Sequence, residues 1–236
     1  MSFERPQFYD TKTQIPAGAR LIDAFPGMAR ELFFIENPSV TKGSAGAQES
    51  LAIFLRKRHL GGVWVYYPWS NTAIRILSEE LYFKVRTARN HNIISASEQN
   101  NYRDTIIGIA GLSVGSAVVS ALTLSGGAKV MKIADFDAIE ASNLNRIKGR
   151  LTDVGSNKAL ITARETWDID PFAERHIWEK GVDRKTMSRF IAGKPKLDVF
   201  VDEMDQIGIK ILARRICRKY HIQVLMATDS GDSVIL

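Results

Sequence analysis

The residues best suited to chemistry begin with a glycine turn and the acid that follows it. Gly111 and Gly115 bracket the segment GLSVGS, which joins an apolar run to a stretch with helical spacing. Glycine allows a phosphate to approach closely, and the N-terminus of the next helix offers free N–H groups to an anion. Asp135 lies 20 residues after Gly115, where nucleotide-binding sheets place the carboxylate that binds ribose hydroxyls. The spacing predicts a nucleotide site, although a glycine turn that only packs a helix on a sheet has the same signature.

Cations and a further acid follow at positions that suit an anionic ligand. The cations stand close together in the sequence, at Arg146, Lys148, Arg150 and Lys158. The phosphates of a nucleoside triphosphate require fixed positive charge of this kind. Asp205 comes after a later apolar run, and a carboxylate there suits Mg²⁺, which prefers oxygen ligands.

Other kinds of site are excluded by the residue types. The single cysteine, Cys217, allows neither an internal disulfide nor a cysteine-based zinc site. The four histidines are scattered, and no GxxxxGK[ST] phosphate loop is present. The net charge of +6 favours anionic partners, but without clustered basic runs it does not indicate nucleic acid. Without a membrane-length apolar run or a signal-peptide core, we expect a cytoplasmic protein with no membrane partner.

The elements that must position these residues become regular beyond residue 104. Apolar runs predict buried strands over 105–110, 130–134, 176–178, 197–201 and 222–226. Helical spacing lies between them, over 114–122, 156–167, 183–192 and 206–219. Strands that alternate with helices and are apolar on both faces predict an α/β fold, with a Rossmann-like, doubly wound, mainly parallel sheet.

The part before residue 104 is less regular. We expect a small α+β subdomain over residues 1–88 and a nucleotide-binding domain over 89–236. The patterns predict a polar loop over 36–50, an aromatic strand in 62–69, a helix over 73–88 and a short helix over 96–103.

The segment 135–146, DFDAIEASNLNR, resembles the nucleotide motif of the ubiquitin-activating-enzyme-like superfamily, the ThiF/MoeB-type adenylyltransferases. Their pattern is D-x-D-x-V-x-x-S-N-L-N-R, and Ile139 replaces the Val. The likeness extends through GLSVGS, Val154-Gly155-x-x-Lys158 and Asp202-x-x-Asp205, and covers roughly residues 86–229. The segments GVWVYYPWS, Arg89-Asn90 and Glu98-Gln99 are similar to a bacterial branch in which some members carry a nitroreductase-like domain, an activity that is not carried over to this chain.

The resemblance implies a role for individual residues. Asp135 would hold the ribose of ATP, and Asp205 would hold Mg²⁺. Arg89 matches an arginine that reaches into the partner subunit's site, which implies a homodimer. The triphosphate would be contacted by Asn143, Arg146 and Lys158. The predicted nucleotide site is completed by Gly111, Ser113, Gly115 and Asp137.

The implied reaction is adenylation of a carboxylate, such as the C-terminus of a ubiquitin-like or sulfur-carrier protein, or a small carboxylate substrate. A carboxylic acid is already ionised at pH 7, so no general base is needed. Cys217 lies within a predicted helix and is expected to be a buried structural thiol, which implies adenylation without thioester transfer. Family members continue with further strands, so we expect the domain to be truncated at its C-terminus.

Simpler interpretations stay open for each residue and for the chain. Arg146 and Lys158 are alternatively surface charges, Arg89 a surface arginine, and Asn143 and Asp205 helix caps. The chain as a whole is alternatively a non-catalytic dimerising scaffold. A third interpretation is an NAD- or FAD-binding domain of an oxidoreductase, which leaves SNLNR and Lys158 unexplained.

Overall fold

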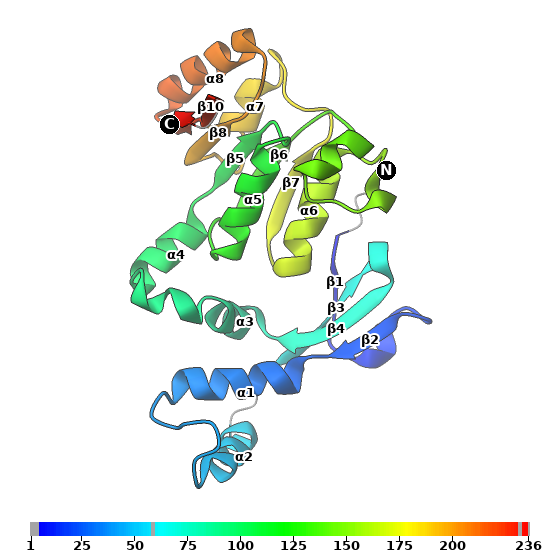
Figure 1. The fold of residues 1–236 in the computed structure, drawn as a ribbon, viewed down its shortest axis with the longest axis vertical. Coiled ribbons are helices and arrows are strands. Elements are labelled where there is room, and N and C mark those ends of the chain that lie inside the picture. The colour runs from blue at the N-terminus through cyan, green and yellow to red at the C-terminus, as the bar shows by residue number, and fades with distance from the viewer. Residues whose placement is uncertain (1–4, 58–59, 231–232, 236) are drawn as a thin grey trace. The chain divides into compact units, whose positions relative to one another are not determined.

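In the computed structural model the chain divides into two units, Met1–Ile94 and Ser95–Leu236 (Figure 1). The structure describes residues 5–57, 60–230 and 233–235. The predicted domain boundary, between residues 88 and 89, falls at the start of the 3-10 helix η3 (Ala88–Asn92), within the N-terminal unit.

The N-terminal unit contains a four-stranded sheet in the order β1-β3-β4-β2. Its strands are β1 (Gln7–Tyr9), β2 (Arg20–Asp23), β3 (Gly62–Tyr67) and β4 (Thr72–Leu77). Its helices are α1 (Phe25–Glu36), α2 (Ala47–Lys57) and α3 (Glu79–Arg86), with short 3-10 turns at Lys12–Gln14 and Pro68–Ser70. The buried residues Ala29, Leu32 and Leu77 form the core between α1, α3 and the sheet.

The helix predicted over residues 73–88 is wrong in its first part. Residues 72–77 form strand β4, which pairs with β3 in the register Val65↔Ile74, and the helix α3 begins only at Glu79. The apolar residues Ile74, Leu77 and Leu81 match helical spacing by coincidence, and pairing with the aromatic strand β3 overrides that local pattern. The predicted loop over 36–50 is also too long, because α2 starts at Ala47.

The second unit has the predicted α/β architecture, with a five-stranded parallel sheet in the order β7-β6-β5-β8-β9. Its strands are β5 (Ile107–Ala110), β6 (Val130–Ala134), β7 (Glu174–Trp178), β8 (Val199–Asp202) and β9 (Gln223–Leu225). A hairpin of β10 (Thr228–Ser230) and β11 (Ser233–Ile235) follows. Within this sheet the chain enters at the central strand β5, continues outwards through β6 to β7, and then returns to β8 on the other side of β5. The direction of winding therefore changes between β5 and β8.

One helix precedes the first strand of this sheet, and the others connect its successive strands. They are α4 (Ala96–Asp104), α5 (Gly115–Leu124), α6 (Lys158–Ile169), α7 (Met187–Ala192) and α8 (Ile207–Tyr220), with 3-10 turns at Ala141–Asn145 (η4) and Leu151–Asp153 (η5). The helices α5 and α6 pack against each other, as do α7 and α8. Cys217 is fully buried in the core between the sheet, α7 and α8, and burial raises its pKa to about 11. This confirms that Cys217 is a buried thiol.

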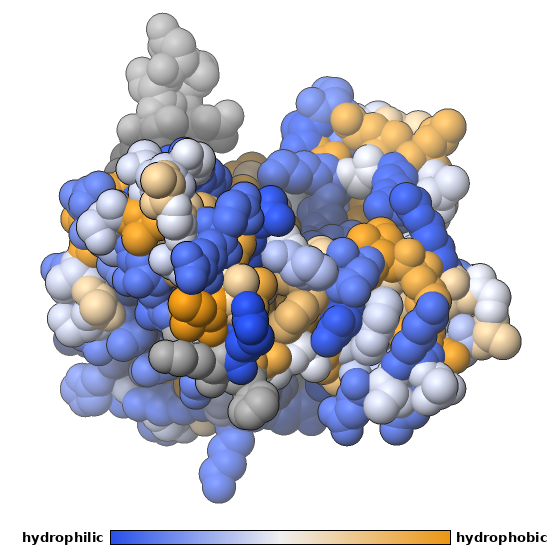
Figure 2. All heavy atoms as spheres, turned by 90° about the horizontal axis from the view of Figure 1, so that it is seen from below, coloured by the Kyte–Doolittle hydropathy of each residue, from blue (hydrophilic) through white to orange (hydrophobic). Residues whose placement is uncertain are grey.

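None of the described helices is long and apolar enough to cross a membrane. On the face shown in Figure 2, hydrophobic residues are interspersed with hydrophilic ones. Scattered apolar side chains of this kind are normal on protein surfaces.

Candidate nucleotide-binding site

A pocket opens at the carboxyl ends of the parallel strands, where the winding direction changes. It is lined by the turn after β5, the loops after β6 and β7, and the segment from the end of β8 to the first turn of α8. Open α/β sheets bind their ligands at this place, because strand ends and helix N-termini converge there. The lining includes Gly111, Ser113, Asp135, Asp137 and Asp205, all of which were predicted from the sequence.

Glycine is required at the first position of the turn after β5. Gly111 has φ +89°, and a Cβ there would collide with the backbone carbonyl of Glu203. Gly115 lies behind the pocket as the first residue of α5, where a Cβ would lie 2.8 Å from the side chain of Ile109. The two predicted glycines therefore bring β5, α5 and the β8 loop close together rather than both facing the ligand.

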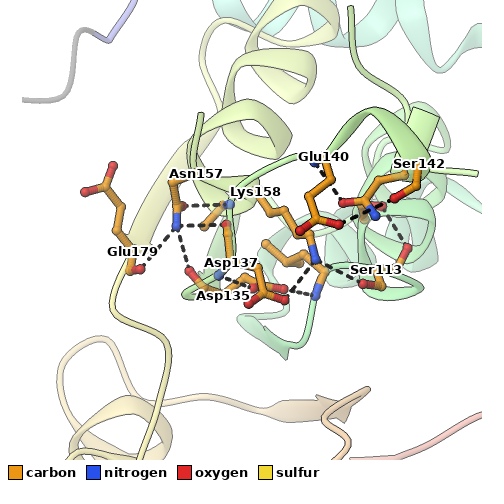
Figure 3. A network of polar contacts seen from close by, with 12 residues as sticks. Ser113, Asp135, Asp137, Glu140, Ser142, Asn157, Lys158 and Glu179 are labelled. Atoms are coloured by element: carbon orange, nitrogen blue, oxygen red, sulfur yellow. Dashed lines mark hydrogen bonds and ion pairs between the residues drawn. The ribbon is translucent and has the colours of Figure 1, made fainter. Parts of the chain in front are cut away.

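A closed ring of hydrogen bonds forms one wall of the pocket (Figure 3). Asp135, which is 8% exposed, accepts hydrogen bonds from the backbone N–H of Leu112 at 2.7 Å and of Asp137 at 2.8 Å. The Lys158 ammonium donates to Asp137 Oδ2 at 2.9 Å and to Ser113 Oγ at 3.3 Å. Because Leu112 and Ser113 are neighbours in the glycine turn, these hydrogen bonds join that turn to the loop after β6 and to the start of α6.

Lys158 is not the solvated surface charge that the sequence left open. The residue is 5% exposed, at the first position of α6, and its backbone N–H also donates to the carbonyl of Asp137. A buried ammonium is costly unless it is paired. The ring supplies that pairing through Asp137.

Asn157 is a positioning residue that the sequence analysis missed. Its Oδ1 accepts hydrogen bonds from the backbone N–H groups of Ala159 and Leu160 and so caps α6. Its Nδ2 group contacts three backbone carbonyls, those of Asp135, Asp137 and Glu179, at 3.0–3.3 Å. One side chain therefore fixes both the start of α6 and the loops after β6 and β7 (Figure 3). An Asn directly before a predicted helix is a capping signal, but its contacts with the distant loop cannot be read from sequence.

The opposite wall of the pocket comes from the segment after β8. Asp205 is exposed and lines the pocket, and its carboxylate has no hydrogen-bond or ion-pair partner among the described residues. The capping alternative for Asp205 is wrong, because the residue at the cap position of α8 is Gln206, which makes no side-chain cap hydrogen bond. Glu203 also lines the pocket, and burial raises the pKa of its carboxyl group.

An ion-pair cluster around the buried Asp202 supports the segment that forms this second wall. Asp202 is fully buried at the end of β8, and its Oδ2 lies 2.7 Å from Arg214 Nη1. Its Oδ1 lies 3.5 Å from Lys210 Nζ. Both cations come from α8, so the cluster fixes that helix against the strand that carries the pocket loop.

Two of the predicted phosphate ligands lie outside the pocket lining. Asn143 is 7% exposed and its Oδ1 accepts from the backbone N–H of Glu140, the cap residue of η4, so it completes the capping box of that turn. Arg146 is exposed, and its guanidinium donates to Asn145 Oδ1 at 2.9 Å and to the Ser142 carbonyl at 3.4 Å. Neither side chain belongs to the pocket lining, and their contact with a triphosphate stays a prediction. Arg89 lies in η3 of the N-terminal unit.

The charged side chains that line the described pocket are all carboxylates: Asp135, Asp137, Glu203 and Asp205. Of the cations predicted to meet the phosphates, Lys158 lies directly behind the lining residues Ser113 and Asp137. Phe136, 67% exposed, lines the same pocket next to Gly181 and was not predicted. It adds a flat apolar surface beside Asp135.

A family model described as ThiF family matches residues 87–231, which is more than half of the chain. The chain belongs to the ThiF family. The match begins just before η3 and includes the pocket and its supporting cluster. It confirms the resemblance carried by the segment DFDAIEASNLNR.

Individual relatives of this ThiF-family chain are longer proteins. The uncharacterised protein MT1398 of Mycobacterium tuberculosis is 36% identical over 171 residues, which are 72% of this chain and 24% of that protein. The tRNA threonylcarbamoyladenosine dehydratase 2 of Saccharomyces cerevisiae is 30% identical over 133 residues, which are 56% of this chain and 29% of that protein. The chain thus spans about a quarter of the length of these curated relatives.

Solved structures share the fold of the second unit. The crystal structure of E. coli tRNA N6-threonylcarbamoyladenosine dehydratase, TcdA, in complex with ATP matches with a TM-score of 0.59 at 20% identity, covering 64% of this chain and 62% of that chain. A complex of the same protein with AMP matches with a TM-score of 0.58. This likeness confirms the Rossmann-like ThiF fold.

Proposed function

We propose that this chain binds ATP with Mg²⁺ in the pocket and adenylates a carboxylate, so that it acts as a ThiF-type adenylyltransferase. The observation that carries the proposal is the hydrogen-bonded ring, which holds a buried carboxylate and a buried ammonium on either side of a glycine turn. Family membership and the ATP and AMP complexes of TcdA support it.

The nucleotide would lie along the ring. Both oxygens of Asp135 already accept one backbone N–H each, and their remaining lone pairs are free to accept ribose hydroxyls. Phe136 and Gly181 would receive the base beside the ribose, since aromatic faces stack on purines. Lys158 would donate to the phosphates across the glycine turn.

The residues present fit a magnesium ion that arrives with the nucleotide. Among the described residues, no group of three or more His, Cys, Asp or Glu side chains could hold a metal. Mg²⁺ is commonly held by one or two carboxylates together with phosphate oxygens and water, and the exposed carboxylate of Asp205 in the pocket lining suits that role. When bound, Mg²⁺ would neutralise phosphate charge in a pocket whose own lining is acidic.

The chain's contribution to such a reaction would be positioning and charge compensation. The attacking carboxylate is ionised at neutral pH, so no side chain has to remove a proton. The α-phosphate must be held in line with that carboxylate while pyrophosphate leaves, and fixed hydrogen-bond donors lower the barrier for this step. The buried thiol of Cys217, with its raised pKa, is unsuited to thioester formation.

The acceptor is a carboxylate from one of two sources. The resemblance suggests the C-terminus of a ubiquitin-like or sulfur-carrier protein, or a small carboxylate. The relatives named as tRNA threonylcarbamoyladenosine dehydratases favour a second candidate, the carboxylate of a threonylcarbamoyl group on tRNA. Arg89 would act across a homodimer, and we place the protein in the cytoplasm.

Binding and exchange measurements test the proposal. Titration with ATP and Mg²⁺ should give saturable binding, whereas NAD and FAD should give none. Exchange of labelled pyrophosphate into ATP should then appear only with the correct acceptor, tested with carrier-protein tails, small carboxylates and tRNA. Binding of NAD alone would support the oxidoreductase alternative, and a dimer that binds no nucleotide would support the scaffold alternative.

A further inference from the structure

Asp137 has been grouped so far with the residues that would contact the nucleotide. Its surroundings set it apart from Asp135, although both line the pocket two residues apart. Asp135 receives two backbone N–H groups and is buried, whereas the side chain of Asp137 is 50% exposed and receives the Lys158 ammonium. The two carboxylates of the DFD segment therefore have different partners.

The link between Asp137 and Lys158 is made twice. The Lys158 ammonium lies 2.9 Å from Asp137 Oδ2, and the Lys158 backbone N–H donates to the Asp137 carbonyl at 2.9 Å. The Lys158 side chain is 6% exposed. A buried ammonium in such a place depends on its partner, because the loss of one member of a buried pair leaves an uncompensated charge.

The ammonium keeps a donor for a ligand. Lysine has three N–H donors, and the ring uses two of them, on Asp137 and Ser113. The third is free to reach a phosphate oxygen at the glycine turn without breaking the ring. The Asp137 charge then stays close to the phosphates and repels them.

We infer that Asp137 is the resident counter-ion of Lys158, rather than a ligand of the ribose. The inference rests on the nucleotide function proposed above. Asp137 holds the ammonium beside Ser113, at the expense of part of the affinity for phosphate. Its influence on a ligand is therefore confined to the phosphate groups.

Comparison of ATP with adenosine isolates that influence. Isothermal titration of both ligands against the whole chain, with Mg²⁺ present, should show that Asp137→Asn binds ATP about threefold to tenfold more tightly, because one nearby negative charge is removed. The affinity for adenosine, which has no phosphate, should stay within about twofold of the unsubstituted protein. The gain for ATP should shrink as salt is raised from about 0.05 to 0.5 M.

Asp135→Asn is the matched control, since it changes the neighbouring carboxylate in the same way. It should weaken ATP and adenosine alike, by about tenfold, because both carry the ribose. If Asp137→Asn weakens adenosine as Asp135→Asn does, Asp137 is a ribose ligand and the inference is wrong. Unchanged or weaker ATP binding by Asp137→Asn also overturns it. An unsubstituted chain that binds no ATP would instead refute the proposed function itself.

Ser113→Ala provides a second variant in case Asp137→Asn fails to fold, which thermal unfolding would reveal. It removes one of the two ring acceptors of the ammonium but leaves the Asp135 hydrogen bonds in place. ATP should bind about threefold more weakly, with adenosine unchanged. An equal loss for both ligands would contradict a ring that acts through Lys158 on the phosphates.

Discussion

Two lysines are buried among the described residues of the second unit, and their surroundings differ in a way that separates the proposed phosphate ligand from a structural cation. Lys132, on β6, is 2% exposed and donates to the carbonyls of Phe190 and Gly193 at 2.8 and 2.9 Å. Burial lowers its pKa to about 8. Lys158, at the start of α6, is 5% exposed but pairs with the half-exposed carboxylate of Asp137.

The comparison shows that burial of a lysine is not by itself a sign of function. Lys132 donates to carbonyls at the end of α7, which lack partners within the helix, and the described pocket lining includes neither Phe190 nor Gly193. The partners of Lys158 line the pocket, so its charge is close to any ligand bound there. Lys158 therefore differs from Lys132 because its hydrogen-bond partners line the pocket.

The largest difference between variants of Lys158 and of Lys132 should appear in their affinity for ATP. Lys158→Met should weaken ATP binding about thirtyfold, the value of a lost charge-assisted hydrogen bond. Its free energy of unfolding should change by less than about 1 kcal/mol, because Asp137 can be hydrated once the ammonium is gone. Calorimetric titration and urea denaturation measure the two effects. Equal ATP affinities of Lys158→Met and the unsubstituted protein would contradict the proposed contact of Lys158 with the phosphates.

Lys132→Met should have the reverse pattern. It leaves the carbonyls of Phe190 and Gly193 without their donor in the core, so the free energy of unfolding should fall by about 2 kcal/mol. ATP affinity of the folded variant should be unchanged. A Lys132→Met protein that is as stable as the original but binds ATP poorly would reverse the assignment of the two lysines.

Asn157 sharpens the comparison on the Lys158 side. Asn157→Ala removes the cap of α6 and the contacts to three carbonyls, and we expect a loss of about 1–2 kcal/mol in unfolding free energy and weaker ATP binding. Asn157→Ser restores a capping oxygen but not the amide donors. It should recover most of the stability and little of the ATP affinity, as urea denaturation and titration would show. Full recovery of both by Ser would mean that only the cap matters.

The smallest effect concerns pH. The pKa of Lys132 in the folded chain, about 8, lies below its ordinary value of 10.5, so the unfolded chain binds the proton more tightly between these values. The free energy of unfolding, taken relative to that of Lys132→Met, should therefore rise as the pH goes from 8 to 10.5. It should fall by the same amount when the pH is lowered back to 8, and stay constant below that. Urea denaturation of both proteins across this range tests the sign. If the difference in unfolding free energy between the two proteins does not change with pH, the pKa of Lys132 is not lowered.

The sequence determined the parallel sheet, the glycine turn, Asp135 and the family, because each depends on residues that are neighbours along the chain. Apolar runs of strand length and the segment DFDAIEASNLNR are local signals. The prediction from sequence was wrong where pairing between segments decides the secondary structure. Thr72–Leu77 is a strand only because β3 lies beside it.

Tertiary structure alone decided which charged residues lie at the pocket. Lys158 and Arg146 look alike in the sequence, yet one ammonium is buried against Ser113, 45 residues away, and the other cation is held by its own turn. A charge is functional or merely solvated according to its burial and the partners that face it. Those partners come from separate strand ends, and only the folded sheet brings them together.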